Sequence, residues 1–325
     1  MRLSVVVPTF DRRERLARTL AALEEERPAI EGGAEVVVVD DGSSDGTSGL
    51  LSSREAEGRL RALRVAHGGP ARARNAGARA ALGEILLFLG DDIVPEPGFL
   101  AAHDAAHREA GEGRRAVLGR TEWDPSRIRV TPMLRHLDRH GLQFGFGLIR
   151  DPERVPVWFF YASNVSLPRE TFLELGGFDE GFGGAAWEDV EFAFRAARAP
   201  CPLRLVYRPA ARARHDHPTT LESFRARQRA SGRAAALFAE KHPELAPDLG
   251  VAEARSLPEE RPYSLRVAER IVRVADPLGL PLPGRVYDKL FRWDYLSGLS
   301  ESLRGGASSR AAALPSEAER LHSFR

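Results

Sequence analysis

Residues 85–95 read ILLFLGDDIVP, a run of apolar residues that stops at two adjacent carboxylates. The unbroken apolar run of residues 85–89 is typical of a strand covered on both faces, and the glycine and proline that follow mark its end. Asp91 and Asp92 therefore belong at the carboxyl end of a strand, the edge of an open α/β sheet where ligands bind. Two carboxylates placed together are costly unless a cation neutralises them, which favours a divalent metal. The alternative is a surface turn that uses Asp-Asp for its turn chemistry.

Strands and helices alternate along the first hundred residues. Apolar runs predict strands over residues 4–7, 36–39 and 60–65, and helical spacing predicts helices over 12–26, 46–54 and 71–82. We expect Asp11 and Asp45 to cap the first two helices. This alternation predicts an α/β fold with a mostly parallel sheet, right-handed crossovers and flanking helices.

The second half of the chain is less regular. We expect helices over residues 98–109, 132–140, 169–175, 187–199 and 221–241, and strands over 116–119, 158–167, 203–206 and 210–214. The stretch 121–156 mixes Pro, Arg, Gly and aromatic residues, which predicts a loop-rich segment over the active face. From Pro243 onward, proline-punctuated amphipathic pieces such as 264–274 and 285–296 predict a helical appendage.

Composition excludes several classes of function. The 47 basic and 46 acidic residues nearly cancel, so we expect no nucleic-acid partner. A single cysteine, Cys201, excludes an internal disulfide framework and a thiolate metal cluster. No stretch approaches the about 18 consecutive apolar residues of a membrane-spanning helix, and residues 3–7 are too short for a secretory signal. We expect a cytoplasmic protein, with peripheral contact at the inner face of the membrane left open and the oligomeric state undetermined.

Polar side chains from three strands are expected at one edge of the sheet. The first strand runs into Pro8 and Thr9, the second ends at Asp41, and the strand of residues 85–89 ends before Asp92. In a parallel sheet these side chains face one crevice. This suits a nucleotide, because a carboxylate can accept the ring N–H of uracil or guanine. The alternative is a capped turn.

Two arginines follow at the start of the helix predicted after Pro70. Arg72 and Arg74, together with the helix N-terminus, could reach a base or a phosphate. The alternative is that both are solvated helix residues. Two common nucleotide-binding modes are excluded, because the first strand is not followed by G-x-G-x-x-G and the chain has no G-x-x-x-x-G-K-[ST].

Six motifs together resemble those of family 2 glycosyltransferases. In order they are VVVPTF (5–10), VVVDDGSSDGT (37–47), ARNAG (73–77), FLGDD (88–92), GGFDE (176–180) and WED (187–189), and the resemblance covers roughly residues 3–240. It implies a GT-A fold, a nucleotide-diphosphate sugar donor, and an inverting transfer that needs Mn²⁺ or Mg²⁺. The implied domain spans residues 1–245, with a nucleotide-binding half (1–95) and an acceptor-side half (96–245). The resemblance does not cover the C-terminal region, where we expect residues 246–325 to form a helical extension with a mobile tail after Gly305.

The resemblance also implies roles for single residues. Thr9, beside Pro8, and Asp41 would contact the base, Asp91 the ribose, and Asp92 the metal. The family's D-x-D motif usually begins with an acid where this sequence has Gly90, which weakens the expected ribose or metal geometry.

His215 resembles the histidine that completes the metal shell in some relatives. A nitrogen ligand there would favour Mn²⁺ over Mg²⁺. The alternative is a histidine that is bonded in the turn before Pro218.

Glu188 and Asp189 are the candidate catalytic residues. By resemblance Asp189 is the general base that removes the proton of the acceptor hydroxyl. The alternative is that both acids compensate the charge at a helix N-terminus.

The sequence therefore predicts a metal-dependent, inverting glycosyltransferase acting on a carbohydrate or lipid-linked acceptor. The main alternative is a non-catalytic nucleotide-sugar or glycan-binding module with the same fold. A sugar-phosphate nucleotidyltransferase is a weaker alternative, because residues 8–13 lack the Gly-rich, basic phosphate loop of that class.

Overall fold

The computed structural model describes residues 1–109, 114–184 and 186–305; the tail predicted to be mobile after Gly305 lies outside these residues. The chain forms two compact units. The first comprises Met1–Ile128, Ile149–Glu180 and Glu188–His217, and the second comprises Arg129–Leu148, Gly181–Trp187 and the chain from Pro218 onward. The expected boundary at residue 245 differs from this division, because the helix of residues 221–241 groups with the helices that follow it.

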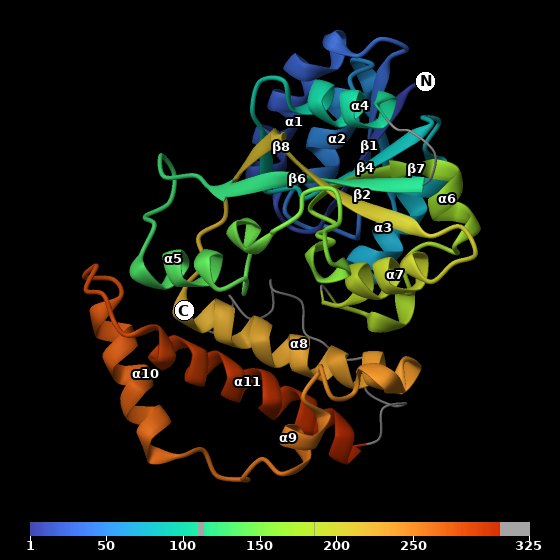
Figure 1. Ribbon diagram of the computed structural model, residues 1–325. Helices are drawn as coiled ribbons and strands as arrows, with labels where there is room; N and C mark the ends of the chain where they lie inside the picture. Colours follow the sequence, from blue (N-terminus) through green and yellow to red (C-terminus); the bar gives the residue numbers. More distant parts are fainter. Residues whose placement is uncertain (110–113, 185, 306–325) are drawn as a thin grey trace. The chain divides into compact units, whose positions relative to one another are not determined.

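The first unit is built on an eight-stranded sheet in the order β3-β2-β1-β4-β7-β6-β8-β5 (Figure 1). Its strands are β1 (Leu3–Thr9), β2 (Ala34–Asp40), β3 (Arg61–Arg64), β4 (Ile85–Leu89), β5 (Ile93–Pro95), β6 (Arg114–Trp123), β7 (Asn164–Pro168) and β8 (Leu203–His215). β1 pairs in parallel with β2 and β4, and β2 pairs in parallel with β3. β7 runs antiparallel to β4 and β6. The parallel sheet expected for the first hundred residues is confirmed, and the strand direction reverses at β7.

Four strand predictions were wrong in extent. The strand predicted over 158–167 is limited to β7, and the 3₁₀ helix η3 (Val157–Phe159) precedes it. The strands predicted over 203–206 and 210–214 are one long strand, β8, because it pairs with β6 on both sides of an irregularity at Gly119/Arg120. β6 itself is longer than predicted for the same reason.

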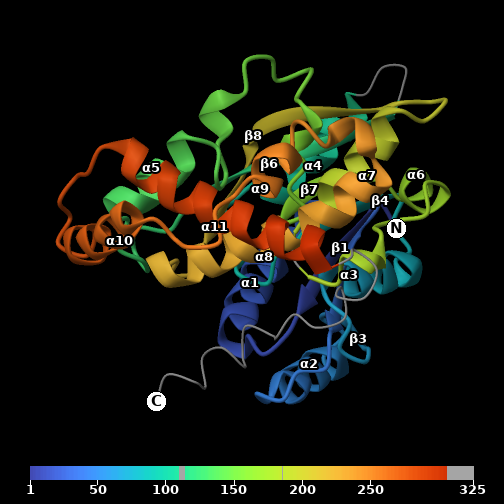
Figure 2. The same ribbon diagram turned by 90° about the horizontal axis from the view of Figure 1, so that it is seen from below.

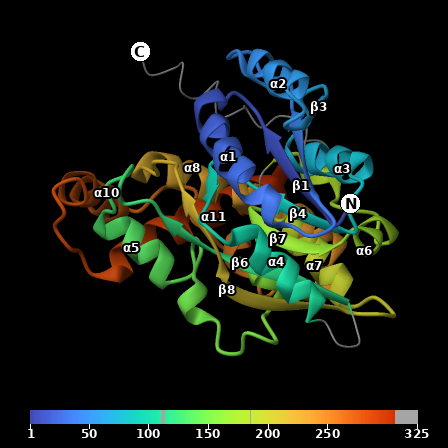
Figure 3. The ribbon, with the colours of Figure 1, turned by 90° about the horizontal axis from the view of Figure 1, so that it is seen from above.

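Helices cover both faces of the sheet. Leu3, Val5 and Val7 of β1 pack in a core formed with α1 (Arg13–Glu26), α2 (Thr47–Ala56) and α4 (Phe99–Arg108), and Figure 3 shows α4 lying along β6 and β8. The opposite face carries α3 (Pro70–Ala80), α6 (Arg169–Glu174) and α7 (Glu188–Ala197). α3 approaches β1 so closely that a Cβ at Gly77 would come within 2.4 Å of Val6 Cγ1.

One carboxylate organises the starts of the first two helices. Asp45 Oδ2 accepts a hydrogen bond from the N–H of Arg13 (2.8 Å) and Oδ1 accepts one from the N–H of Thr47 (3.0 Å). The prediction that Asp11 caps α1 was wrong. Asp11 has φ +50° and its carboxylate accepts from the N–H of Ser44 (2.6 Å).

The second unit is helical. It contains α5 (Pro132–Arg139), α8 (Leu221–Lys241), α9 (Val251–Arg255), α10 (Tyr263–Ala275) and α11 (Gly284–Gly305), with 3₁₀ turns η2 (Phe146–Leu148) and η5 (Pro243–Leu245); the remaining 3₁₀ turns of the chain are η1 (Arg27–Ala29) and η4 (Glu180–Phe182). The helix predicted over 221–241 is confirmed, and the one predicted over 285–296 continues to Gly305. None of the helices in the described ranges combines the length and apolar composition that a membrane crossing requires.

α8 and α11 lie side by side in Figures 1 and 2. Phe224 contacts Phe291, with ring centroids 4.7 Å apart, and further along both helices Arg229 pairs with Glu301. The second contact lies further toward the C-terminus in both helices than the first, so α8 and α11 run in the same direction. Glycines permit their close approach, because a Cβ at Gly232 would come within 1.8 Å of the Tyr295 carbonyl oxygen.

Candidate active site

Asp91 and Asp92 follow β4 and are buried at the carboxyl edge of the sheet. Thr9 Oγ1, at the end of the neighbouring β1, donates to Asp91 Oδ2 (2.8 Å). Arg12 Nη1 contacts both carboxylates, at 3.2 Å from Asp91 Oδ1 and 2.9 Å from Asp92 Oδ2. The structure thus brings together two predicted residues from different strands, Thr9 and Asp91, and adds Arg12, which balances the local negative charge.

Two imidazoles lie against Asp92. His217 Nδ1 is 3.2 Å and His215 Nε2 is 3.6 Å from Asp92 Oδ2. Strand pairing places them there, because β8 sets His215 opposite Ile93 of β5. Burial acts to raise the pKa of Asp92, but His215, His217 and Arg12 hold it well below its ordinary value. One carboxylate with two imidazoles is a donor set that fits Mn²⁺ better than Mg²⁺.

The pKa of Asp91 shifts in the opposite direction. Burial and the charge of Asp92 raise it, against the opposing effects of Arg12 and Thr9. When the pKa values of two adjacent acids shift in opposite directions, one acid loses its proton more readily than the other. Asp92 remains a carboxylate that can hold a cation, whereas Asp91 is the weaker acid of the pair.

Asp41 forms a second part of the site, at the end of β2. Its two carboxylate oxygens accept hydrogen bonds from the N–H groups of Gly68 and Gly69, each at 2.9 Å. His67 Nδ1 is 3.0 Å from Asp41 Oδ2, and the His67 ring lies 4.2 Å from that of Phe10. Burial raises the pKa of Asp41 despite these contacts.

Glu188 and Asp189 begin α7, as the sequence predicts. Glu188 is buried and accepts a hydrogen bond from Arg74 Nη1 (2.8 Å). Burial and the charge of Asp189 raise the pKa of Glu188 to about 7. Asp189 Oδ2 accepts from the N–H of Ala162 (3.1 Å), and burial raises the pKa of Asp189 as well. In this structure Arg74 is therefore engaged with Glu188, whereas Arg72 is exposed and lies over Gly68.

The backbone before β7 connects these acids to the two aspartates. Ala162 N–H binds Asp189, and the next residue, Ser163, accepts a hydrogen bond from the N–H of Gly90 (3.1 Å). Gly90 immediately precedes Asp91. Asp189 is thus attached to the strand end that lies beside the Asp91-Asp92 turn.

Gly90 occupies a confined position. A Cβ at residue 90 would lie 2.9 Å from Ile93 Cγ1 and 3.0 Å from Asp92 Oδ1. An acidic side chain at this position, as in the usual D-x-D motif, would displace the side chain of Ile93 or of Asp92. The departure from the family pattern therefore has a steric reason in this chain.

Asn75 connects α3 to the segment that contains the Gly176-Gly177-Phe178 motif. Its side chain donates to the carbonyl of Phe178 (2.8 Å) and accepts from the N–H of the same residue (2.9 Å). Gly177 has φ +71°, and a Cβ there would come within 2.6 Å of Asn75 Oδ1. The glycine is therefore required both for its backbone conformation and for this contact.

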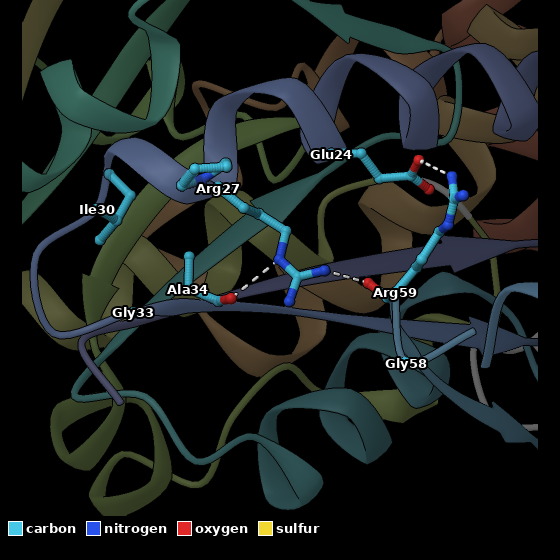
Figure 4. Close-up of a pocket in the computed structure, with 8 residues that line it drawn as sticks. Glu24, Arg27, Ile30, Gly33, Ala34, Gly58 and Arg59 are labelled. Atoms are coloured by element: carbon cyan, nitrogen blue, oxygen red, sulfur yellow. Dashed lines mark hydrogen bonds and ion pairs between the residues drawn. The ribbon is translucent and has the colours of Figure 1, made fainter. Parts of the chain in front are cut away.

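A separate hollow lies at the opposite edge of the sheet. It measures about 500 Å³ and is lined by residues at the end of α1 and before β2 and β3 (Figure 4). Arg27 donates to the carbonyl of Ala34 (3.0 Å), and Glu24 pairs with Arg59 (2.8 Å). Because Ala34 begins β2, whereas Asp41 follows its end, the hollow is not part of the candidate site.

Sequence comparison shows which known proteins this chain resembles. Residues 4–112 match the model of the family described as Glycosyl transferase family 2. They include β1, β2 and β4 with Thr9, Asp41, Asp91 and Asp92. Over these residues the chain is similar to glycosyl transferase family 2.

Named glycosyltransferases are similar to a longer part of the chain than the family model. The chain is 34% identical over 223 residues to validoxylamine A glucosyltransferase of Streptomyces hygroscopicus subsp. jinggangensis, covering 62% of this chain and 52% of that protein. It is 28% identical over 257 residues to pre-mycofactocin glycosyltransferase of Mycobacterium tuberculosis, covering 74% of this chain and 48% of that protein. The chain thus spans about half the length of these curated relatives.

Solved structures support the fold. Mannosyltransferase PcManGT from Pyrobaculum calidifontis, in complex with GDP-Man and Mn²⁺, matches with a TM-score of 0.56 and 21% identity, over 93% of this chain and 86% of that chain. At this identity the match shows the fold alone. The predicted GT-A fold with C-terminal helices is confirmed.

Three site residues were not singled out from the sequence, namely Arg12, Asn75 and His217. Arg12 and Asn75 contact partners 79 and 103 residues away along the chain. A local sequence pattern does not predict contacts over such separations. His217 had a usable signal, because residues two apart in an extended chain point to the same side. His215 was named for the metal, whereas His217 makes the shorter contact with Asp92.

Proposed function

We propose that the protein transfers a sugar from a nucleotide-diphosphate sugar to a carbohydrate or lipid-linked acceptor, with inversion and with Mn²⁺ or Mg²⁺. The observation that carries the proposal is the carboxyl edge of the sheet, where Asp92 lies beside two imidazoles and Asp189 is anchored to the adjacent strand end. The names of the relatives and the GDP-Man and Mn²⁺ in the structural neighbour support the same chemistry.

The donor would be held by residues of the first unit. In this proposal Thr9 and Asp41 would contact the base and Asp91 the ribose, since they lie at or directly after the ends of the adjacent parallel strands β1, β2 and β4. The aromatic pair of Phe10 and His67 offers a flat surface beside Asp41. Asp92 and His215, with His217, would hold the metal, which when bound stabilises the charge on the leaving diphosphate as a Lewis acid.

Asp189 would remove the proton of the acceptor hydroxyl. Its raised pKa makes it a better proton acceptor than an ordinary aspartate, and the Ala162 N–H fixes one of its oxygens. Glu188, held by Arg74, is a positioning residue in this scheme, because its contact is with Arg74 and it sets the start of α7.

Asp189→Asn tests the assignment against the non-catalytic binding module. A thermal-shift screen of nucleotide sugars with Mn²⁺ first identifies the donor, because a ligand that binds the folded state raises its stability. Release of nucleoside diphosphate is then measured for wild type and variant. We expect turnover in wild type, a loss of about 100-fold or more in kcat in the variant, and unchanged donor affinity. Donor binding without turnover in wild type would instead establish the binding module.

We also propose that the second unit contacts an anionic lipid surface. α10 exposes an apolar stripe at helical spacing, formed by Tyr263, Val267, Ile271 and Val274. Arg266 and Arg270 border the stripe and are exposed. An exposed apolar face beside arginines is the pattern of a helix that lies in the membrane interface.

Co-sedimentation with vesicles tests this contact. We expect wild type to bind vesicles rich in phosphatidylglycerol more strongly than vesicles of phosphatidylcholine, and Ile271→Glu/Val274→Glu to lose binding. Leu82→Glu, at an exposed apolar position of the first unit, is the matched control and should bind like wild type. Equal binding by all variants would refute the contact. A wild-type dimer that the double substitution dissociates would assign the stripe to a second copy of the chain.

A further inference from the structure

Two histidines and an aspartate meet in the second unit, outside the site described above. His136 and His140 lie four residues apart, at the end of α5, and Asp288 comes from the first turns of α11. One ligand atom from each residue lies within 4.8 Å of the other two. Among the described residues this is the only group of three or more His, Cys, Asp or Glu side chains gathered so closely.

The geometry of the three side chains is convergent. His136 Nε2 is 2.8 Å from Asp288 Oδ1. The rings of His136 and His140 are stacked, with centroids 4.2 Å apart and planes inclined by 28°. A separation of four residues puts two side chains on the same side of a helix, which is the spacing that helical His-His metal sites use.

A glycine lets the start of α11 pack closely against both imidazoles. A Cβ at Gly284, the first residue of α11, would lie 3.0 Å from His136 Cε1, 3.1 Å from His136 Nδ1 and 3.8 Å from His140 Nε2. Gly284 does not have a positive φ, so its backbone does not require glycine. The absent side chain instead allows the first residue of α11 to approach both rings.

The burial of the three residues differs in a way that suits an ion entering from solvent. His136 is buried and packs against the ring of Tyr287, with centroids 5.0 Å apart. His140 is exposed, and about half of the Asp288 side chain is exposed.

We propose that His136, His140 and Asp288 form a binding site for a transition-metal cation of the Zn²⁺ class. Two imidazoles and a carboxylate are ligands that Zn²⁺ accepts, with water completing a tetrahedral shell. The ion would link α5 to α11 and so stabilise the second unit. This site is independent of the glycosyl-transfer site.

The alternative is that the His136–Asp288 hydrogen bond alone fixes α5 to α11. That contact accounts for two of the three residues. It gives no role to His140, nor to the close approach of Gly284 to the His140 ring. The two explanations make different predictions for zinc binding by variants of His140.

Zinc binding by the full chain tests the proposal. Protein stripped with EDTA is dialysed against micromolar ZnCl₂, and bound zinc is measured by mass spectrometry in parallel with thermal unfolding. We expect His140→Ala and Asp288→Asn each to bind one zinc fewer per chain than wild type and to lose most of the zinc-induced rise in Tm. Gly284→Ala should weaken binding severalfold. Asp138→Asn, an exposed carboxylate of the same helix outside the cluster, is the matched control.

Asp92→Asn separates this site from the first unit. Any zinc held by Asp92, His215 and His217 is lost in that variant, while the zinc that depends on His140 should remain. Equal zinc content in wild type, His140→Ala and Asp288→Asn would overturn the proposal, as would a wild type that binds no zinc. Either result would leave the His136–Asp288 hydrogen bond as the whole function of the cluster.

Discussion

Gly90 determines how much room Asp92 has. Because a Cβ at residue 90 would lie 3.0 Å from Asp92 Oδ1 and 2.9 Å from Ile93 Cγ1, restoring the acid that the family usually has should harm this protein. We expect Gly90→Asp to lower kcat/KM for donor turnover by about tenfold or more, since a shift of about 1 Å in Asp92, the proposed metal ligand, is costly. The measurement is the rate of nucleoside diphosphate release at saturating Mn²⁺.

Gly49→Asp is the matched control for that substitution. Gly49 lies in α2, and a Cβ there would meet no atom within 4 Å, so this variant should keep wild-type activity. An increase in activity for Gly90→Asp would show that β5 and Asp92 accommodate the longer side chain.

Glu188 gives the protein a pH-dependent stability. Its pKa is about 7 in the folded protein against an ordinary 4.5, so the folded state holds the proton more tightly than the unfolded chain. The stability contributed by the protonated form is complete below about pH 4.5 and is lost as the pH rises through about 7. Glu188→Gln cannot titrate. The wild type should therefore lose stability between pH 5 and pH 8 relative to this variant. The difference in the free energy of unfolding, variant minus wild type, should rise by about 3 kcal/mol over this range.

Urea denaturation of both proteins at the two pH values measures this difference. A constant difference between Glu188→Gln and wild type would mean that Glu188 is ionised throughout, with Arg74 as its permanent partner.

The site acids were predictable because each follows a local pattern. Asp41 and Asp91-Asp92 come directly after apolar strands, and Asp189 lies in the first turn of α7. Arg12 and Asn75 were not predictable in their roles, because both act on residues that only the folded sheet brings near.

At the scale of elements, the contact between α8 and α11 depends on small residues. A Cβ at Gly298 would lie 1.9 Å from the Arg229 carbonyl oxygen, a separation that requires the helices to move apart. We expect Gly298→Ala to destabilise the second unit by about 2 kcal/mol or more. Thermal and urea unfolding followed by circular dichroism measure the change.

Gly147→Ala is the control within the same unit. A Cβ at Gly147 would meet no atom within 4 Å and its φ is not positive, so this variant should unfold like wild type within about 0.5 kcal/mol. Equal stability of Gly298→Ala and wild type would contradict the close packing of the two helices.

The elements with strong periodicity were predicted well, and those set by distant pairing were not. α8 begins and ends at the residues expected from its sequence. Thr220 caps its N-terminus. β8 was divided in two, because its continuity comes from pairing with β6 and β5 and not from its own residues. Asp11 was predicted to cap α1. The N–H of Arg13 at the start of that helix is instead bound by Asp45, which lies 32 residues further along the chain.

For the whole molecule, the sequence predicted the class of fold but not the division of the chain. The alternation of strands and helices was sufficient for an α/β sheet. The grouping of residues 129–148 with the C-terminal helices was not visible, because it results from contacts such as His136 with Asp288 and Met133 with Asp276.

The central claim is that the carboxyl edge of the sheet binds a nucleoside diphosphate together with a divalent ion held by Asp92. Calorimetric titration of UDP and of GDP, each with and without Mn²⁺, tests it most directly in wild type and Asp92→Asn, with circular dichroism to confirm folding and His217→Gln as a second variant. We predict that one nucleotide binds wild type in the presence of Mn²⁺, and that both variants weaken Mn²⁺-dependent binding by about tenfold or more. Binding that is equally tight without Mn²⁺, or unchanged in Asp92→Asn, would contradict the claim.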